Sequence, residues 1–342
     1  MEINYGIQGL RFFIILGVFI KHLNDIIGFP YFLDFGARGV ELFFLLSGFL
    51  EGMHWYYKPE LGKRLVWKSC FAFFKKKITK FYFLHFLTFL FSIPLVLSFS
   101  DKSKVELLIT GVLNLALLQS WFDISKWSYN GVAWFLSTIC FCYLLTPALS
   151  RLFSRKFLPS FLYLTALFSL KLILDTVHYC YFFPPYRFLE FSIAFVAGNL
   201  FLQTNFCNLL VNAGRKNKTF GNMWQSFWMI VTILSRIVGD QKWIPAIFII
   251  PFIFLVVSLF INGIIGQFLS QRYLVSLGNL VFPFFLCHYL VIQYVSLFTN
   301  TILKLPASIN LYFIAILSFC FSIGCSILLS CLNNYIIYRR HE

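Results

Sequence analysis

The stretch IQGLRFFIILGVFIKHLNDIIG, residues 7–28, indicates the class of this fold. It is long enough to cross a bilayer as a helix, because a spanning helix needs about 20 mainly apolar residues. Stretches of the same kind recur as far as residue 338, with short polar breaks between them. The expected spans are 7–28, 37–57, 78–99, 131–150, 158–176, 187–204, 224–239, 243–263, 274–297 and 307–337. The sequence predicts an all-α, polytopic transmembrane bundle of about ten helices, forming one integral-membrane domain over residues 1–342.

The composition excludes two broad classes of protein. The chain is 59% hydrophobic and only 12% charged, and its mean hydropathy is +0.79, which is too apolar for a soluble globular domain. Its net charge of +15 would suit a nucleic-acid-binding protein only if the basic residues formed a patch on a soluble fold. They lie instead between the apolar spans, so we expect the lipid bilayer, and no nucleic acid, as a partner.

The basic residues also predict the orientation of the chain. Most of them fall in loops that share one side if the N-terminus is cytoplasmic, as the positive-inside rule requires. Both termini are therefore expected in the cytoplasm. The segment 105–121 is apolar but near the lower limit of spanning length, and counting it as a span would place the basic residues at 151–156 outside. We interpret this segment as interfacial or re-entrant.

Ionisable residues inside the first span are candidates for function, because charge at mid-bilayer is costly. Arg11 and His22 are eleven residues apart, about three helical turns, and this spacing returns them to nearly the same face about 16 Å apart along the axis. With the N-terminus inside, Arg11 lies near the cytoplasmic end and His22 beyond the midplane. Lys21 points elsewhere. Arg11 and His22 are predicted to line one cavity.

The second span places Arg38 and Glu41 at a depth comparable with His22. We hypothesise a contact between His22 and Glu41, because a carboxylate would orient the imidazole and raise its basicity, as general-base catalysis on a hydroxyl requires.

A basic cluster before the third span suggests a phosphate site. Lys77 and Lys80 are expected on one helical face, close to the depth of Arg11. A coenzyme A thioester carries its phosphates at one end and its acyl group at the tip of a long arm, which suits basic groups and a base half a membrane apart. The shape of an acyl-CoA donor therefore suits this arrangement. The scattered cysteines show no ligand spacing, so neither a metal nor a bound cofactor is expected.

Several segments resemble the acyltransferase 3 family of integral-membrane O-acyltransferases. The segments are GLRFFIILGVFIKH (9–22), GVELFFLLSGFL (39–50), KKKITKFYF (75–83), GVAWFLSTICFCYLLTPAL (131–149), RFLEFSIAFVAGNLF (187–201) and LVSLGNLVFPFFLCHYLV (274–291). The first matches the family's Arg, ten residues, His signature, and Glu41 stands at the family's acidic position. Lys77 and Lys80 replace the family's usual arginine pair, which keeps the charge but loses the bidentate fork. The resemblance implies surface-glycan acetylation at the bacterial cytoplasmic (inner) membrane.

Each of the remaining polar and aromatic residues can have either a structural or a functional role. His288 either faces the same cavity as His22 or bonds a neighbouring helix, and the sequence does not separate these. Arg187 and Glu190 either form part of an acceptor pocket or pair within their helix, and the pair is favoured. Trp134, in the family-like fourth span, is a candidate cavity residue. Trp127 is interpreted as an interfacial anchor.

Together these features predict a polysaccharide-modifying O-acetyltransferase. It would move an acyl group from cytoplasmic acyl-CoA to a hydroxyl of a cell-surface glycan or its lipid-linked precursor. His22 would act either as a general base or as an acylated nucleophile. The alternatives are a secondary transporter, for which internal symmetry would be expected, and a non-catalytic membrane partner in polysaccharide assembly or export.

Overall fold

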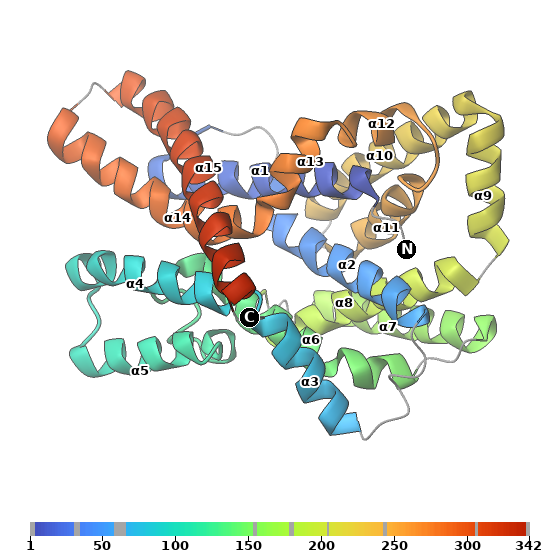
Figure 1. The fold of residues 1–342 in the computed structure, drawn as a ribbon, viewed down its shortest axis with the longest axis horizontal. Helices are drawn as coiled ribbons and strands as arrows, with labels where there is room; N and C mark the ends of the chain where they lie inside the picture. Colours follow the sequence, from blue (N-terminus) through green and yellow to red (C-terminus); the bar gives the residue numbers. More distant parts are fainter. Residues whose placement is uncertain are drawn as a thin grey trace. The chain divides into compact units, whose positions relative to one another are not determined.

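Every regular element in the described part of the chain is helical (Figure 1). The computed structural model describes residues 4–30, 35–57, 66–152, 156–177, 181–203, 205–241, 245–304 and 307–339. Its α-helices are α1 (Tyr5–Ile27), α2 (Phe35–Tyr56), α3 (Val66–Ile78), α4 (Tyr82–Phe99), α5 (Lys104–Leu115), α6 (Trp134–Leu152), α7 (Phe157–Val177), α8 (Pro184–Gln203), α9 (Asn205–Lys216), α10 (Lys218–Gln241), α11 (Ile249–Ser258), α12 (Ile264–Leu269), α13 (Arg272–Asn279), α14 (Val281–Phe298) and α15 (Ala307–Arg339). Short helical turns are η2 (Gln119–Trp121), η3 (Gly131–Ala133), η4 (Pro245–Phe248) and η5 (Thr299–Leu303).

Each predicted span overlaps a helix, but fewer of the helices qualify as membrane spans. Within the described residues, five helical stretches are long and apolar enough to cross a bilayer, and a sixth is added if α8 and α9 count as one broken span. The five are 82–99, 131–152, 157–176, 281–303 and 310–336. α1 and α2 have 23 and 22 residues but are not among them. The chain is thus a multi-pass membrane protein, and the number ten and the cytoplasmic termini stay predictions.

Two compact units interleave along the chain. Unit 1 comprises Met1–Arg11, Glu41–Phe74 and Phe141–Val275, and unit 2 comprises Phe12–Val40, Lys75–Cys140 and Ser276–Glu342. In unit 1, α7 packs on α8, α8 also contacts α9 and α11, and α10 packs against α9, α11 and α12. Stacking of Trp228 on Phe254, with ring centroids 4.3 Å apart, joins α10 to α11.

Close backbone contact joins α2 to α8 within unit 1. Gly48 and Gly52 form a Gly-x-x-x-Gly pattern, and a Cβ atom at either position would overlap a backbone carbonyl oxygen of α8. Gly198 of α8 faces the α2 backbone in the same way. Small residues at this spacing let membrane helices approach closely, where packing supplies most of the stabilisation. This contact holds α2 against α8 within unit 1. Glu41 lies on α2, and Arg187 lies on α8.

Unit 2 contains three helices that run in the same direction. The Phe81 and Phe282 ring centroids lie 5.6 Å apart, and the Tyr294 hydroxyl donates to the Phe91 carbonyl oxygen at 2.7 Å, so α4 and α14 are parallel. α15 returns beside α14, and Figure 1 shows the two as neighbours at the end of the chain. Contacts described below make α1 parallel to α14 as well. One end of unit 2 therefore gathers the last turns of α1, α4 and α14.

The segment 105–121 forms a helix that is too short to span. α5 has 12 residues, about 18 Å of helix, against a hydrocarbon core of about 30 Å. It begins with a capping box between Ser103 and Glu106 and packs on α4. After α5 the chain continues through tight turns to α6. This geometry supports the interfacial or re-entrant interpretation.

The predicted helix over 78–99 is interrupted at its start. α3 ends at Ile78, α4 begins at Tyr82, and the Lys80 amide donates to the Lys77 carbonyl oxygen at 3.2 Å in the turn between them. Lys77 therefore lies in the last turn of α3 and Lys80 in the turn that follows it. The expectation that the two side chains share one face stays a prediction.

Candidate functional site

His22 lies in the part of α1 that belongs to unit 2, and a carboxylate accompanies it on the same helix. Its side chain is 14% exposed, and its Nδ1 lies 3.6 Å from Oδ2 of Asp25, three residues further on. This distance is longer than a direct hydrogen bond but short enough for a charge interaction. The other Asp25 oxygen pairs with Lys21 Nζ. Helical spacing thus places an acidic side chain beside the predicted catalytic imidazole.

Two residues of α14 complete the surroundings of His22. The ring centroid of His288 lies 5.3 Å from that of His22, and the Tyr289 ring lies 5.1 Å away, edge to face at 77°. One turn earlier, Phe19 and Phe284 meet at 5.7 Å. These successive pairs run along both helices in the same order, so α1 and α14 are parallel. His288 thus lies beside His22, and whether the two face one cavity stays a prediction.

The hydrogen bond of His288 defines its tautomer. Its Nδ1 lies 3.0 Å from the Phe284 carbonyl oxygen, which can only accept, so Nδ1 carries the proton. Its Nε2 is then a bare acceptor, fully buried and without a hydrogen-bond partner among the described residues. Phe284 stacks on the ring at 5.7 Å. His288 is a neutral imidazole with an open acceptor, held in place by aromatic side chains.

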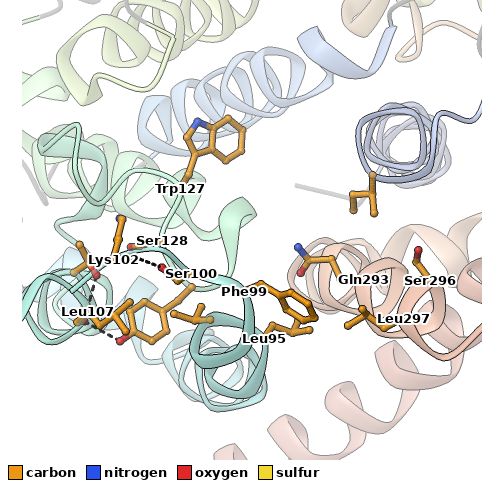
Figure 2. Close-up of a pocket in the computed structure, with 14 residues that line it drawn as sticks. Leu95, Phe99, Ser100, Lys102, Leu107, Trp127, Ser128, Gln293, Ser296 and Leu297 are labelled. Atoms are coloured by element: carbon orange, nitrogen blue, oxygen red, sulfur yellow. Dashed lines mark hydrogen bonds between the residues drawn. The ribbon is translucent and has the colours of Figure 1, made fainter. Parts of the chain in front are cut away.

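A cavity of about 380 Å³ opens in unit 2, one helical turn beyond His22 (Figure 2). Ile26 and Gln293 line it, and they follow His22 and Tyr289 by four residues on the same helix faces. The lining residues are Ile26, Leu95, Val96, Phe99, Ser100, Lys102, Leu107, Thr110, Trp127, Ser128, Tyr129, Gln293, Ser296 and Leu297. Burial raises the pKa of the Tyr129 phenol, which therefore stays neutral. The cavity is mixed in character, with apolar walls and several hydroxyl, amide and aromatic groups.

Glu41, Arg187 and Glu190 meet in a second polar cluster, which is buried inside unit 1. Nη1 of Arg187 donates to Glu41 Oε1 at 2.8 Å and to both carboxylate oxygens of Glu190 at 2.8 and 2.9 Å. The guanidinium Nε donates to the Tyr181 carbonyl oxygen at 2.7 Å. The predicted pair of Arg187 with Glu190 is present, and Glu41 joins it across the contact of α2 with α8.

The cluster continues onto α7. Lys171 Nζ lies 2.5 Å from Asp175 Oδ1, 2.7 Å from the Tyr186 hydroxyl and 3.2 Å from Glu190 Oε1. The Tyr186 hydroxyl also donates to Asp175. Two cations therefore face three carboxylates in a region where Arg187 and Lys171 are almost wholly buried. The bond of Arg187 to Glu41 joins α8 to α2, and the contacts of Lys171 with Tyr186 and Glu190 join α7 to α8, which gives this network the form of an internal tie between helices.

Glu41 is thus engaged by Arg187, whereas His22 belongs to the other unit. The hypothesised contact between His22 and Glu41 stays a prediction. Asp25 is the carboxylate that the structure places beside His22.

The other predicted site residues occupy separate places. Arg11 lies at the end of the unit 1 part of α1, and its Nη1 reaches Gln8 Oε1 at 3.4 Å. Arg38 is half-buried near the start of α2. Lys77 is half-buried and Lys80 is exposed at the turn before α4. Trp134 is buried at the start of α6, where its carbonyl oxygen accepts from Ser120 Oγ at 2.7 Å.

Three groups of polar residues near these clusters were not predicted from the sequence, although two of them carried a usable signal. Asp25 lies within the predicted first span, three residues after His22. Lys171 and Asp175 are four residues apart in an otherwise apolar span, the spacing of an intrahelical ion pair. Tyr289 offered no such signal, because a tyrosine in an apolar helix is common packing.

The described residues contain no group of three or more His, Cys, Asp or Glu side chains that could hold a metal ion. The chemistry available in unit 2 is that of an imidazole with a neighbouring carboxylate, a second imidazole and a phenol.

Comparisons with known proteins point in the same direction as this geometry. A family model described as "Acyltransferase domain" matches residues 4–332. The chain is 26% identical over 330 residues to the O-acetyltransferase OatA of Staphylococcus aureus, an alignment that covers 85% of this chain and 51% of that protein. It is 24% identical over 332 residues to the acyltransferase MdmB of Streptomyces mycarofaciens, with 84% of this chain and 79% of that protein covered. The chain therefore spans about half the length of OatA. No solved structure matches it.

Proposed function

This chain belongs to the acyltransferase family, and we propose that it is a membrane O-acyltransferase that uses His22 to move an acyl group from acyl-CoA to a hydroxyl. The donor is acetyl-CoA on the cytoplasmic side. The acceptor is a cell-surface glycan or its lipid-linked precursor, and the enzyme resides in the bacterial cytoplasmic membrane. The names of OatA and MdmB, an O-acetyltransferase and an acyltransferase, support the reaction class.

The observation that carries this proposal is the setting of His22. Its imidazole is mostly buried, has Asp25 at 3.6 Å and contacts Tyr289, one turn from a cavity of about 380 Å³. A general base needs a neighbouring group that orients it and a nearby space for the hydroxyl that it deprotonates. Both are present around His22 within one compact unit.

Two chemical routes fit this setting. In the direct route, the imidazole removes the acceptor proton, the alkoxide oxygen attacks the thioester carbonyl, and the C–S bond breaks as the CoA sulfur takes the proton. In the covalent route, the imidazole nitrogen attacks the thioester first, CoA leaves, and the acceptor hydroxyl then displaces the acyl group from the nitrogen. In both routes Asp25 stabilises the positive charge that develops on the imidazole. Trapping of radiolabelled acyl groups on purified protein separates the two.

The donor phosphates are proposed to bind at Lys77 and Lys80, and the role of Arg11 stays a separate prediction. Lys77 and Lys80 lie on the turn before α4, whose far end reaches the cavity in unit 2. α4 has 18 residues, about 27 Å, so phosphates at one end and the acceptor at the other require an extended donor. The pantetheine arm of a CoA thioester has that form. The positive-inside distribution supports the cytoplasmic side for these lysines.

Surface-glycan acylation tests the reaction. Mass spectrometry would compare deletion cells that carry wild-type protein, His22→Ala or His54→Ala, where His54 is an exposed histidine near the end of α2. We expect acetyl esters with the wild type and with His54→Ala, and none with His22→Ala at equal expression. Acetylation that does not differ between deletion and wild-type cells would overturn the proposal. Substrate flux in reconstituted vesicles without an acyl donor would favour a transporter instead.

The donor site has its own test on purified protein. Lys77→Gln and Lys80→Gln should raise KM for acetyl-CoA about tenfold or more, since each removes a charge-assisted bond to phosphate. Lys76→Gln, an exposed neighbour in the same cluster, is the matched control and should leave KM unchanged. Equal effects of all three variants would show a non-specific charge effect in place of a defined site.

A further inference from the structure

The cavity beside His22 has a rigid wall, built by the connection from α5 to α6. The Asn114 side chain donates to the Ser128 carbonyl oxygen at 2.9 Å, and Ser128 Oγ donates to the Ser125 carbonyl oxygen at 2.7 Å. The Gln119 side-chain amide donates to the Ala133 carbonyl oxygen at 2.7 Å. The Gln119 carbonyl oxygen accepts from Ser125 Oγ at 3.0 Å. Side chains that bond backbone groups in this way replace regular secondary structure. The wall is therefore preorganised.

Tyr129 shows how tightly this wall is held. Its φ of 58° is in the left-handed region, which costs energy for a residue with a side chain. Its hydroxyl donates to the Leu107 carbonyl oxygen at 2.8 Å, and its ring packs 4.5 Å from that of Phe89. A Cβ at Gly111 would lie 2.7 Å from that hydroxyl, so a larger residue there would displace the Tyr129 side chain. The surrounding contacts force the Tyr129 ring to face the cavity.

The chemistry of the lining indicates what the cavity binds. Trp127 lines the cavity and is 51% exposed, although hydrogen bonds hold the loop that carries it. Figure 2 shows Trp127 and Lys102 on the side of the connection, with Gln293 and Ser296 of α14 on the other side. Among the described lining residues, Lys102 is the only one with a charged side chain. Its Nζ donates to the Ile124 carbonyl oxygen at 2.5 Å, which holds the cation at the rim.

We propose that this cavity binds one negatively charged sugar of the acceptor, with Trp127 packing on the ring and Lys102 binding its carboxylate or phosphate. Gln293 and Ser296 then bond ring hydroxyls, and an acceptor hydroxyl points back one helical turn towards His22. The volume of about 380 Å³ is within the range of small-molecule sites, about 300–1,000 Å³. The proposal rests on the proposed function. It replaces the sequence interpretation of Trp127 as a bilayer anchor.

The test uses variants of the cavity with matched controls on the same connection. Lys102→Gln and Trp127→Ala alter the lining, whereas Lys126→Gln and Phe122→Ala alter a half-buried and an exposed side chain that do not line it. Deletion cells carrying each variant are compared by mass spectrometry of their acidic and neutral surface glycans. Acetyl-CoA hydrolysis by each purified protein reports whether the donor side is still folded and active.

We expect acetyl esters on acidic glycans, reduced about tenfold to a hundredfold by Lys102→Gln, since a hydrogen bond to a charged group is lost. Trp127→Ala should cause a loss of similar size, Lys102→Arg should retain most of the ester, and both controls should match the wild type. Hydrolysis of acetyl-CoA should be unchanged throughout. Esters confined to neutral glycans, or unaffected by the cavity variants, would overturn this inference while leaving the proposed function intact. No esters and no hydrolysis in the wild type would instead overturn the proposed function.

The anion can come from two sources, which the same cells distinguish. A carboxylated sugar in the polymer predicts that esters persist in glycans released from their lipid carrier and lie on uronic-acid-type units. A phosphate of a lipid-linked precursor predicts esters on the sugar next to the phosphate. Either result supports anion binding in this cavity if Lys102→Gln removes the acetyl esters.

Discussion

Replacing Asp25 by asparagine tests whether this carboxylate assists the proposed catalyst. Asp25 Oδ2 lies 3.6 Å from Nδ1 of His22, and asparagine keeps the shape of the side chain while removing its charge. In the proposed reaction a positive charge develops on the imidazole as it takes a proton or an acyl group. The ground state is neutral at this nitrogen, so the carboxylate stabilises the transition state selectively.

The size of the effect follows from this distance and from exposure. Two unit charges 3.6 Å apart interact by about 1 kcal/mol at the dielectric constant of water and about 5 kcal/mol at an effective value of 20. Asp25 is 41% exposed, and Lys21 already shares its charge, so the lower figure applies. A loss of about 1 kcal/mol corresponds to a decrease in kcat of about fivefold.

The assay is the steady-state acylation rate of purified protein in detergent, with acetyl-CoA and extracted glycan. Asp25→Asn should lower kcat about fivefold and leave KM for acetyl-CoA unchanged. Asp123→Asn is the control, because it removes an exposed carboxylate that pairs with Lys126 at the same i,i+3 spacing. Lys21→Met should not reduce the rate, since it removes the cation that competes with His22 for the Asp25 carboxylate. Full activity of Asp25→Asn, or an equal loss in Lys21→Met, would refute the assigned role.

Three further predictions concern stability. Arg187→Met removes the buried cation that Glu41 and Glu190 share, so the free energy of unfolding in detergent should fall by about 3–5 kcal/mol; unchanged thermal unfolding would contradict the internal tie. Gly48→Leu should lower Tm because its side chain overlaps the α8 backbone, whereas Gly324→Leu, which has nothing within 4 Å, should not; equal Tm values would rule out the close approach. Hydrogen bonds from Ser103 hold the pKa of Glu106 below its ordinary value of about 4.3, so its stabilisation of α5 is full above that pH and is lost as pH falls through the lower folded pKa. Hydrogen exchange of α5, corrected for the intrinsic rate, should show this loss, and a Glu106→Gln profile with the same pH dependence would contradict it.

Local pattern alone predicted much of the fold. A run such as residues 310–336 is predicted as a helix without knowledge of its neighbours, since its length and apolarity match a bilayer whatever surrounds it. The spacing of Arg187 and Glu190 likewise predicted their ion pair, because i,i+3 neighbours meet on any helix. The same rule applied to Asp25 would have identified the carboxylate beside His22.

Other features depend on which helices pack together, and the chain order does not contain that information. The sequence does not specify which cation Glu41 contacts. The close approach of α2 to α8, which Gly48 and Gly52 permit, brings Glu41 to Arg187. His288 lies beside His22 only because α14 runs parallel to α1.

The sequence by itself determined that this is a helical membrane protein of the acyltransferase family with a histidine, His22, in its first long helix, because length, apolarity and motif spacing are local properties of the chain. The tertiary structure decided the partners of that histidine and the cavity beside it. Those features come from α1, α4, α14 and the connection between α5 and α6, which are far apart in the chain. Their juxtaposition is set by side-chain packing and by hydrogen bonds such as that of Asn114 to Ser128, which a linear pattern does not specify.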